Sequence, residues 1–480
     1  MTALPVAVAG QLRIGGELVA ASGSFPVEDP ATGAVLTEVH NGSEDDARAA
    51  VDAAAAALGP WSATAPRQRA EILRRAFELM MQRADRLAEL IVRENGKTLA
   101  DARGEVTYSA EFFRWYSEEA VRIDGALTTS PAGGNRIIAL RQPVGVSVLV
   151  TPWNFPAAMA TRKIGPALAA GCTVVLKPAS DTPLTALAVA DVLAEAGVPP
   201  GVVNVVPARR SGPVVGARLA HPATRKLSFT GSTEVGRVRL ESAAQRVLNC
   251  SMELGGNAPF IVFADADLEA AVDGAMAAKM RNAGESCIAA NRFLVAAPVA
   301  AEFAGMLAAR LSALRVGPGI EPSSDVGPMV NEGARDDIAA LVDAAVDGGA
   351  KVEAGAGVPR RPGWFYTPTV LSGVASDDAI LGEEIFGPVA PVVAFDDEDE
   401  VIAAANDTIH GLAAYVYTGD LARGLRVCEA LEAGMIGLNR GFISDPAAPF
   451  GGVKQSGLGR EGGHDGLLQF LETKYIAASW

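Results

Sequence analysis

The chain has 480 residues, of which 49% are hydrophobic and 20% charged, so it can bury more than one core and is not globally disordered. Its 41 basic and 56 acidic residues give a formal net charge of -15. Most of the surface therefore repels phosphate groups, which argues against nucleic acid and anionic membranes as partners.

Two helices are predicted near the N-terminus. Ser43 with Asp46 three positions later resembles a capping box and predicts a helix over residues 43–59. A second, longer helix is predicted from Pro66, because apolar residues then recur at helical spacing until Gly96 supplies a stop.

Residues 145–245 alternate β-rich runs with helical runs. The β-rich runs read GVSVLV, TVVL, VVNVV and KLSF. Strict alternation of strand and helix predicts βαβ units and a parallel sheet. Sheets of this kind bind ligands beyond the carboxyl ends of their strands, and dinucleotides are common ligands there.

A second series of helices and strands follows SMELGGNAPFIVF. It comprises a helix over 267–281, the strand NRFLV, a helix over 299–314 and further αβ pairs to about residue 438. These features predict a second α/β domain. Residues 123–142 and the tail after Gly459 fit neither series, and we expect them to pair with each other or with another subunit as arms.

Neither a membrane span nor a metal centre is predicted. The longest uncharged stretch, 142–161, contains three prolines, and the N-terminus lacks the basic region of a signal peptide, so we expect a cytoplasmic protein. Cys172, Cys250, Cys287 and Cys428 form no C-x-x-C pair, and the four histidines are scattered. All four thiols should be free in a reducing compartment.

Cys287 is the most informative of the cysteines. Cys172 and Cys428 lie in apolar or amphipathic runs and suit the role of buried filler. Cys287 instead lies in RNAGESCIAANR, among glycine and small polar residues. A thiol in such a loop is a candidate nucleophile that is exposed to a substrate and partly ionised.

Four other motifs contain candidate functional residues. FTGSTEVG would let backbone amides near Gly231 and Ser232 approach a pyrophosphate, although a plain turn is equally consistent. Lys177 ends a strand and can bind ribose hydroxyls or simply be solvated. Asn154, between two prolines, can donate to an oxyanion or close a turn, and Glu253 can act as a general base or be an ordinary solvated carboxylate.

Taken together, seven motifs resemble the aldehyde dehydrogenase superfamily across nearly the whole chain. They are TPWNFP, KPASDTPL, FTGSTEVG, MELGGNAPFIV, NAGESC, EEIFGP and PFGGVKQSGLGREGG. The resemblance implies an α/β fold with a Rossmann-like dinucleotide-binding domain, a catalytic domain and a small β oligomerisation arm. The corresponding ranges are 1–122 with 143–252, 253–438, and 123–142 with 460–480, and the resemblance further implies a homodimer or homotetramer.

The resemblance also assigns roles to single residues. Cys287 corresponds to the family's nucleophile, Glu253 to its general base and Asn154 to its oxyanion donor. The implied cofactor contacts are Thr151, Pro152, Trp153, Lys177, Ser180, Gly231, Ser232, Leu254, Glu384 and Phe386. The implied reaction oxidises an aldehyde through a thiohemiacetal and a thioester, which water then hydrolyses to a carboxylic acid.

Two residues depart from the common family pattern. Glu285 stands where many members carry glutamine; pointed at the thiol it would raise the thiol pKa, and paired elsewhere it would be neutral in effect. Ser180 stands where many NAD-preferring relatives carry a glutamate that repels a 2′-phosphate. We therefore expect NADP to be accepted and preferred, with NAD also possible.

Within the superfamily the motifs are most similar to those of succinate-semialdehyde dehydrogenases. That resemblance implies that Arg162, Arg281 and Ser444 hold a substrate carboxylate, although Arg281 can alternatively cap a helix. Glutarate semialdehyde, one methylene longer, remains an alternative substrate, as does a neutral or cationic aldehyde such as a betaine aldehyde. A non-oxidative esterase or a structural family member is the remaining alternative, which retention of the three catalytic residues disfavours.

Overall fold

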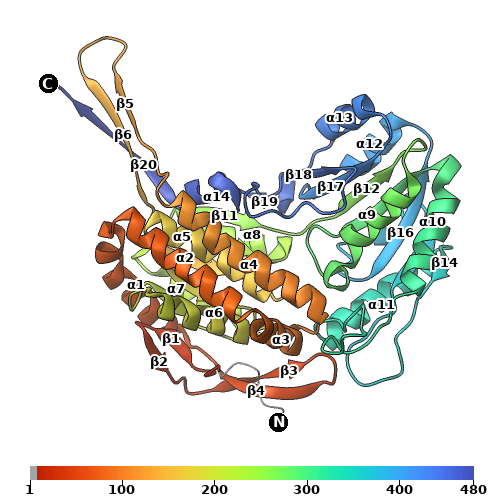
Figure 1. Cartoon of the computed structure of the whole chain (residues 1–480), viewed down its shortest axis with the longest axis horizontal. Coiled ribbons are helices and arrows are strands. Elements are labelled where there is room, and N and C mark those ends of the chain that lie inside the picture. Colours follow the sequence, from red (N-terminus) through yellow and green to blue (C-terminus); the bar gives the residue numbers. More distant parts are fainter. Residues whose placement is uncertain (1–7) are drawn as a thin grey trace.

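The computed structural model describes residues 8–480, which form two α/β lobes and a projecting β arm (Figure 1). The first sheet has the strand order β19-β11-β10-β7-β8-β9-β1-β2. The strands are β1 (Leu12–Ile14), β2 (Glu17–Val19), β7 (Val146–Val150), β8 (Thr173–Lys177), β9 (Val203–Val205), β10 (Thr224–Thr230), β11 (Asn249–Glu253) and β19 (Gly457–Leu458). The run from β11 to β9 is parallel, as the alternating pattern predicts, and the outer pairings are antiparallel.

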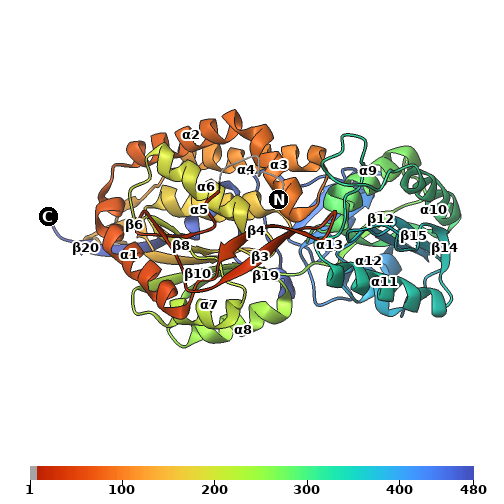
Figure 2. The same cartoon turned by 90° about the horizontal axis from the view of Figure 1, so that it is seen from below.

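Helices cover both faces of the first sheet (Figure 2). On one face lie α1 (Glu44–Ala63), α7 (Ser211–Ala220) and α8 (Thr233–Ala244), and on the other lie α5 (Pro156–Ala170) and α6 (Pro183–Ala196). Every residue of β7 and β8 is consequently buried. This double cover explains why these strands read as continuous apolar runs rather than alternating ones.

The structure confirms the first predicted helix and corrects the second. Ser43 caps α1 with the reciprocal bonds of a capping box. The single helix expected from Pro66 to Gly96 is two helices, α2 (Pro66–Gln82) and α3 (Ala84–Asn95), separated at Arg83. The backbone leaves helical geometry there while apolar spacing continues on both sides, so periodicity alone did not reveal the break.

The second sheet has the order β14-β15-β16-β13-β12-β17-β18 and is parallel except for β14. Its strands are β12 (Ala258–Val262), β13 (Ala290–Ala296), β14 (Lys351–Ala354), β15 (Thr369–Ser372), β16 (Val389–Phe395), β17 (Ala413–Tyr417) and β18 (Met435–Leu438). The helices of this part are α9 (Leu268–Met280), α10 (Ala297–Ser312), α11 (Glu332–Asp347), α12 (Glu398–Asn406) and α13 (Leu421–Ala430). Helices α9 and α10 lie within two residues of their predicted bounds.

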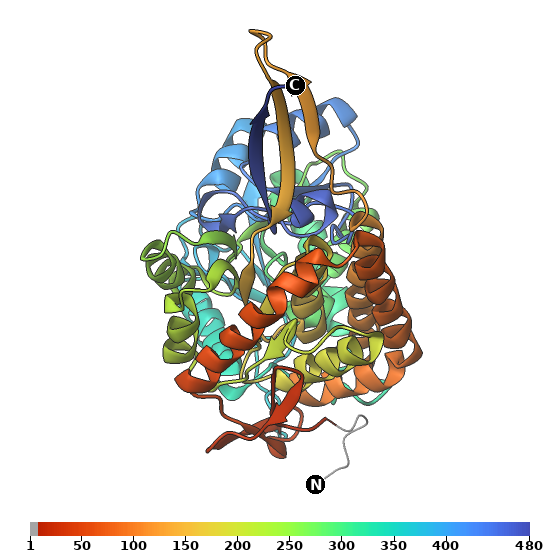
Figure 3. The same ribbon diagram turned by 90° about the vertical axis from the view of Figure 1, so that its left-hand side faces the viewer.

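A three-stranded antiparallel sheet projects from the first lobe (Figure 3). It contains β5 (Ala126–Thr129), β6 (Arg136–Pro143) and β20 (Leu471–Ala478), so the two segments that fitted neither series pair with each other. Within the predicted tail segment, residues before β20 form α14 (Gly463–Leu468), which packs on α5 and on α4 (Leu99–Glu119). A separate hairpin, β3 (Ser24–Asp29) with β4 (Ala34–His40), lies against α3.

Residues 8–480 contain neither a membrane-spanning helix nor a candidate metal cluster. No helix in that range is long and apolar enough to cross a bilayer. The range contains no group of three or more histidine, cysteine, aspartate and glutamate side chains placed to hold a metal ion.

Candidate active site

A cavity of about 430 Å³ lies at the carboxyl ends of β7, β8 and β10. Chain order reverses here, because β8 follows β7 on one side whereas β10 flanks it on the other. Parallel sheets bind ligands at such points. The predicted residues that line the cavity are Thr151, Pro152, Trp153, Asn154, Arg162, Lys177, Ser180, Gly231, Ser232, Leu254, Arg281, Cys287, Glu384, Phe386 and Ser444.

Cys287 projects into this cavity from a loop with unusual backbone geometry. Asn282 and Ala283 both have a φ of 52°, and Gly284 follows with a φ of 81°. The Asn282 side chain donates to the carbonyl oxygens of Asn154 (3.0 Å) and Glu285 (3.2 Å). Consecutive left-handed residues held by such bonds fix the nucleophile's position before a substrate arrives.

The Cys287 thiol is protonated at neutral pH in this structure. Burial raises its pKa to about 12; Arg162 opposes the shift, while Glu384 and Glu253 add to it. The partly ionised thiol expected from the sequence is therefore wrong for the protein alone, because neighbouring carboxylates and burial disfavour the thiolate. A base must take the proton before the sulfur attacks.

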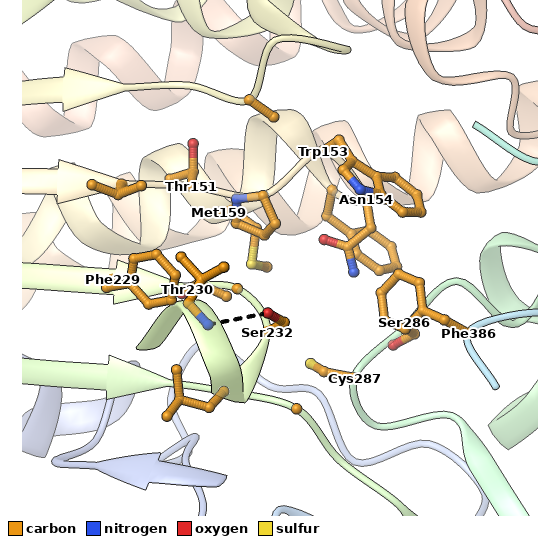
Figure 4. A pocket seen from close by; sticks show the side chains of 18 of the residues that line it. Thr151, Trp153, Asn154, Met159, Phe229, Thr230, Ser232, Ser286, Cys287 and Phe386 are labelled. Atoms are coloured by element: carbon orange, nitrogen blue, oxygen red, sulfur yellow. Dashed lines mark hydrogen bonds between the residues drawn. The ribbon is translucent and has the colours of Figure 1, made fainter. Parts of the chain in front are cut away.

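Asn154 faces the same space as Cys287. Figure 4 shows the cysteine sulfur pointing into the region beneath the asparagine amide. Asn154 Nδ2 donates to the Glu285 carbonyl at 3.1 Å, and the Asn154 carbonyl accepts from Lys97 Nζ at 2.7 Å. One bond of the amide group thus fixes its orientation, and its second N–H is free to donate to an oxyanion.

Glu253 is the one predicted residue that lies outside the cavity lining. It ends β11, is buried, and its Oε2 has no hydrogen-bond partner among residues 8–480. Burial, together with the charge of Glu461, raises its pKa well above the usual carboxyl range. The charge of Glu253 also raises the pKa of Cys287, so the carboxyl group and the thiol are electrostatically coupled.

Glu461 connects the general-base candidate with the cationic side of the site. Its carboxylate forms ion pairs with Lys163 Nζ and, at 2.6 Å, with Arg162 Nε, and all three groups are buried. Although burial raises it, the pKa of Glu461 is lowered overall by Lys163 and Arg162. Glu461 therefore remains ionised and disfavours ionisation of the neighbouring Glu253.

Glu285 points away from the thiol. Its Oε1 accepts a hydrogen bond from the Val330 backbone N–H at 3.0 Å, and burial raises its pKa to about 8. It is not among the groups that perturb Cys287. Of the two orientations that the sequence left open, the structure has the carboxylate paired elsewhere, and at neutral pH much of it is uncharged.

Aromatic rings surround the guanidinium of Arg281, which lines the same cavity as Cys287. Arg281 Nη1 donates to Ser444 Oγ at 3.1 Å, and the guanidinium carbon lies 4.7 Å from the centroid of the Phe155 ring and 5.1 Å from that of Phe442. Arg281 carries no carboxylate partner among the described residues. It can therefore accept a carboxylate from a small ligand, whereas Arg162 is already paired with Glu461.

The part of the cavity at the carboxyl ends of β8 and β10 fits a dinucleotide. Lys177 is buried at the end of β8 and forms no ion pair within residues 8–480, and Ser232 caps α8 beside Gly231. Glu384 Oε1 accepts from Gly256 N–H at 3.0 Å, and a Cβ at Gly255 would lie 2.7 Å from Glu384 Oε2. Glycine therefore keeps space beside this carboxylate, as hydrogen bonding to a ribose requires.

A family model described as the aldehyde dehydrogenase family matches residues 18–476. The chain belongs to that family. A succinate-semialdehyde dehydrogenase of Paenarthrobacter nicotinovorans is 56% identical, covering 92% of this chain and 98% of the relative. A glutarate-semialdehyde dehydrogenase of Pseudomonas putida is 48% identical, with 98% of both chains covered. A crystal structure of an NADP dependent enzyme of Escherichia coli is 48% identical, covers 98% of both chains and superposes with a TM-score of 0.97.

Several residues of this aldehyde dehydrogenase site had no role in the sequence analysis. Tyr108, Phe155 and Phe450 line the cavity, and the Phe450 ring centroid lies 4.2 Å from the Arg162 guanidinium carbon. Glu461 lies within a quoted motif, SGLGREGG, but nothing in that motif indicates its ion pairs. The aromatic residues carry no local signal either, because they come from α4, the start of α5 and the loop before β19.

Proposed function

We propose that this aldehyde dehydrogenase oxidises succinate semialdehyde to succinate with NADP as the electron acceptor. The observation that carries this proposal is the pairing of Arg281 with Ser444 in the same cavity as Cys287. A guanidinium without a carboxylate partner favours an aldehyde that bears its own carboxylate. The net charge of -15 does not oppose this, because the cation acts at contact distance.

The proposed reaction starts with proton removal from Cys287. Only the ionised fraction of Glu253 accepts this proton, and the sulfur attacks the aldehyde carbon while the Asn154 amide and the Cys287 N–H bind the oxyanion. A dinucleotide held by Lys177, Ser232 and Glu384 would supply the acceptor for the hydride that leaves the tetrahedral carbon. Glu253 first releases the thiol proton to solvent. It then removes a proton from water, whose oxygen attacks the thioester carbon. The C–S bond breaks to give the acid, and Glu253 returns its proton to the Cys287 sulfur.

The preference for NADP rests on the ribose end of the cavity. Ser180 offers a hydroxyl where a carboxylate would repel a 2′-phosphate, and Lys177 supplies a cation beside it. The E. coli relative described as NADP dependent supports the same assignment. NAD can occupy the same contacts without the phosphate.

We further propose that the domain roles follow the ranges given above and that the arm joins copies of this chain into a homodimer or homotetramer. Leu127 and Tyr475 on the arm are 64% and 60% exposed. Apolar side chains displayed on an edge-bearing sheet suit a subunit contact. Light scattering of the intact protein gives the molar mass directly, and a monomer at micromolar concentration would contradict this proposal.

The test of the reaction is NADPH formation by purified protein with succinate semialdehyde, glutarate semialdehyde, acetaldehyde and a betaine aldehyde. We expect the two acid aldehydes to give the highest kcat/KM and Cys287→Ala to abolish turnover with each aldehyde. Glutarate semialdehyde is included because a relative named as a glutarate-semialdehyde dehydrogenase is 48% identical to this chain. Highest activity with the cationic aldehyde would refute the carboxylate pocket, and absence of nicotinamide binding would refute the oxidation itself.

A further inference from the structure

The ribose end of the cavity has an unusual set of cations behind its lining. Lys177, Ser180 and Ser211 line the cavity there, and Ser211 begins α7. Asp181 is the one carboxylate in this part of the lining; its oxygens bind Ser180 Oγ and Asn331 Nδ2, each at 3.3 Å. A single carboxylate therefore faces Lys177, and it is already hydrogen-bonded on both oxygens.

Arg218 lies directly behind the strand end that carries Lys177. Its side chain is fully buried, and Nη2 donates to the Val206 carbonyl at 3.0 Å. Val206 N–H in turn donates to the carbonyl of Leu176, the residue before Lys177, at 3.0 Å. A short chain of backbone hydrogen bonds thus connects the guanidinium to the strand end that carries Lys177.

The charge of Arg218 has no counterion. Within residues 8–480 it forms no ion pair, and its Nε and Nη1 have no hydrogen-bond acceptor. Burying an unpaired cation costs free energy unless an anion approaches it. A second largely buried arginine, Arg239, lies on helix α8, which contacts α7. Arg239 is 8% exposed, and its Nε also lacks a hydrogen-bond acceptor among the described residues.

The charges of these arginines reach Lys177. The pKa of Lys177 is lowered to about 8, mainly by burial; Arg218 and Arg239 contribute to the shift and Asp181 opposes it. The groups facing Lys177 from α7, α8 and the segment after β8 therefore carry two positive charges and one negative charge. This leaves an excess of positive potential at the ribose end, although the whole chain is strongly negative.

We propose that Arg218 and Arg239 are positioning residues that select the 2′-phosphate of NADP over the 2′-hydroxyl of NAD through their charge, from behind Lys177. This inference rests on the proposed function in one respect, the use of a nicotinamide dinucleotide. It does not depend on the aldehyde. Uncompensated buried cations favour the ligand that brings two additional negative charges, and they do so without touching it.

The first experiment is equilibrium binding of NADP, NAD, 2′,5′-ADP and 5′-AMP to the intact protein and to Arg218→Met. We expect the variant to bind NADP and 2′,5′-ADP about tenfold more weakly, and NAD and 5′-AMP less than twofold more weakly. Arg246→Met is the matched control, since Arg246 is an exposed arginine in the turn after α8 and its loss changes the net charge equally. That control should leave all four dissociation constants unchanged.

The pH dependence supplies a readout that a merely structural role would not move. In the parent protein the dissociation constant for NADP should rise as pH passes about 8, where Lys177 loses its proton. The 2′-phosphate does not titrate in that window, because its second pKa is about 6. In Arg218→Met the rise should begin at higher pH, since the variant lacks one charge that lowers the Lys177 pKa.

The binding results distinguish a failure of this inference from a failure of the proposed function. If the parent protein binds neither dinucleotide, the proposed function fails. If the parent binds NADP but Arg218→Met weakens NADP and NAD by the same factor, or leaves the pH midpoint in place, the inference is overturned. Should Arg218→Met not fold, Arg239→Met must lower NADP binding selectively and Arg218→Lys must retain it, and the opposite pattern would equally refute the proposal.

Discussion

Arg281→Met removes the guanidinium that we assign to the substrate carboxylate and keeps an apolar side chain of similar length. The guanidinium lies 4.7 Å from the Phe155 ring centroid and 5.1 Å from that of Phe442, so methionine can fill the same space between the rings. Ser444 loses its 3.1 Å bond from Arg281 but stays available to the substrate. The variant therefore tests the charge with little change in cavity shape.

The magnitude follows from the hydrogen bonds that the substrate would lose. A hydrogen bond to a charged group contributes about 1.5–3 kcal/mol, and a guanidinium can offer two. Because Ser444 remains and Arg162 is paired with Glu461, we take a net loss of about 3 kcal/mol, which corresponds to roughly a hundredfold in kcat/KM. The change should appear mainly in KM, because the carboxylate lies away from the reacting carbon.

The assay compares initial rates of NADPH formation from succinate semialdehyde and from butanal, which has the same number of carbons and no carboxylate. For Arg281→Met we expect the hundredfold loss with the acid aldehyde and less than threefold change with butanal. Ser444→Ala should weaken the acid aldehyde by a smaller factor, about tenfold. Equal losses with both aldehydes would refute the reasoning, since the arginine would then serve the cavity's structure.

Three further predictions concern the catalytic loop and its bases. Because the pKa of Glu253 is raised, kcat/KM should increase with pH above the usual carboxyl range. Glu253→Gln should lower turnover by about 10²–10⁴-fold and flatten that increase. An unchanged pH profile in the variant would contradict the assignment of Glu253 as the base. Asn154→Ala should reduce kcat by about 10²–10³-fold with little change in NADP affinity, as measured by binding and steady-state kinetics. Burial raises the pKa of Glu285 from 4.5 to about 8, so the folded state loses stability as the pH rises between these two values. Glu285→Gln removes this loss, so the Tm of the variant relative to the parent protein should be higher at pH 9 than at pH 5. The variant should retain the activity of Cys287 at pH 7. Melting curves at the two pH values test this, and a pH-independent difference would refute it.

Local sequence was sufficient for much of the fold. The capping box at Ser43, the buried runs of β7 and β8 and the glycine at the end of α3 each depend on neighbouring residues, so they are visible in the sequence. The break at Arg83 was missed because side-chain spacing on its two sides stays compatible with one helix. Where the signal was local, prediction and structure agree.

For the candidate site, too, local motifs and tertiary structure contributed different information. The sequence by itself determined the residue types at the centre, because a cysteine in a small polar loop and the motifs around Asn154 and Glu253 are short contiguous patterns. Only the tertiary structure decided that Glu285 bonds Val330 rather than facing the thiol, that Glu461 pairs with Arg162, and that Arg218 lies unpaired behind Lys177. These contacts join residues that are far apart in the chain. Their side-chain directions, burial and charge environment arise from tertiary packing, which no local pattern contains.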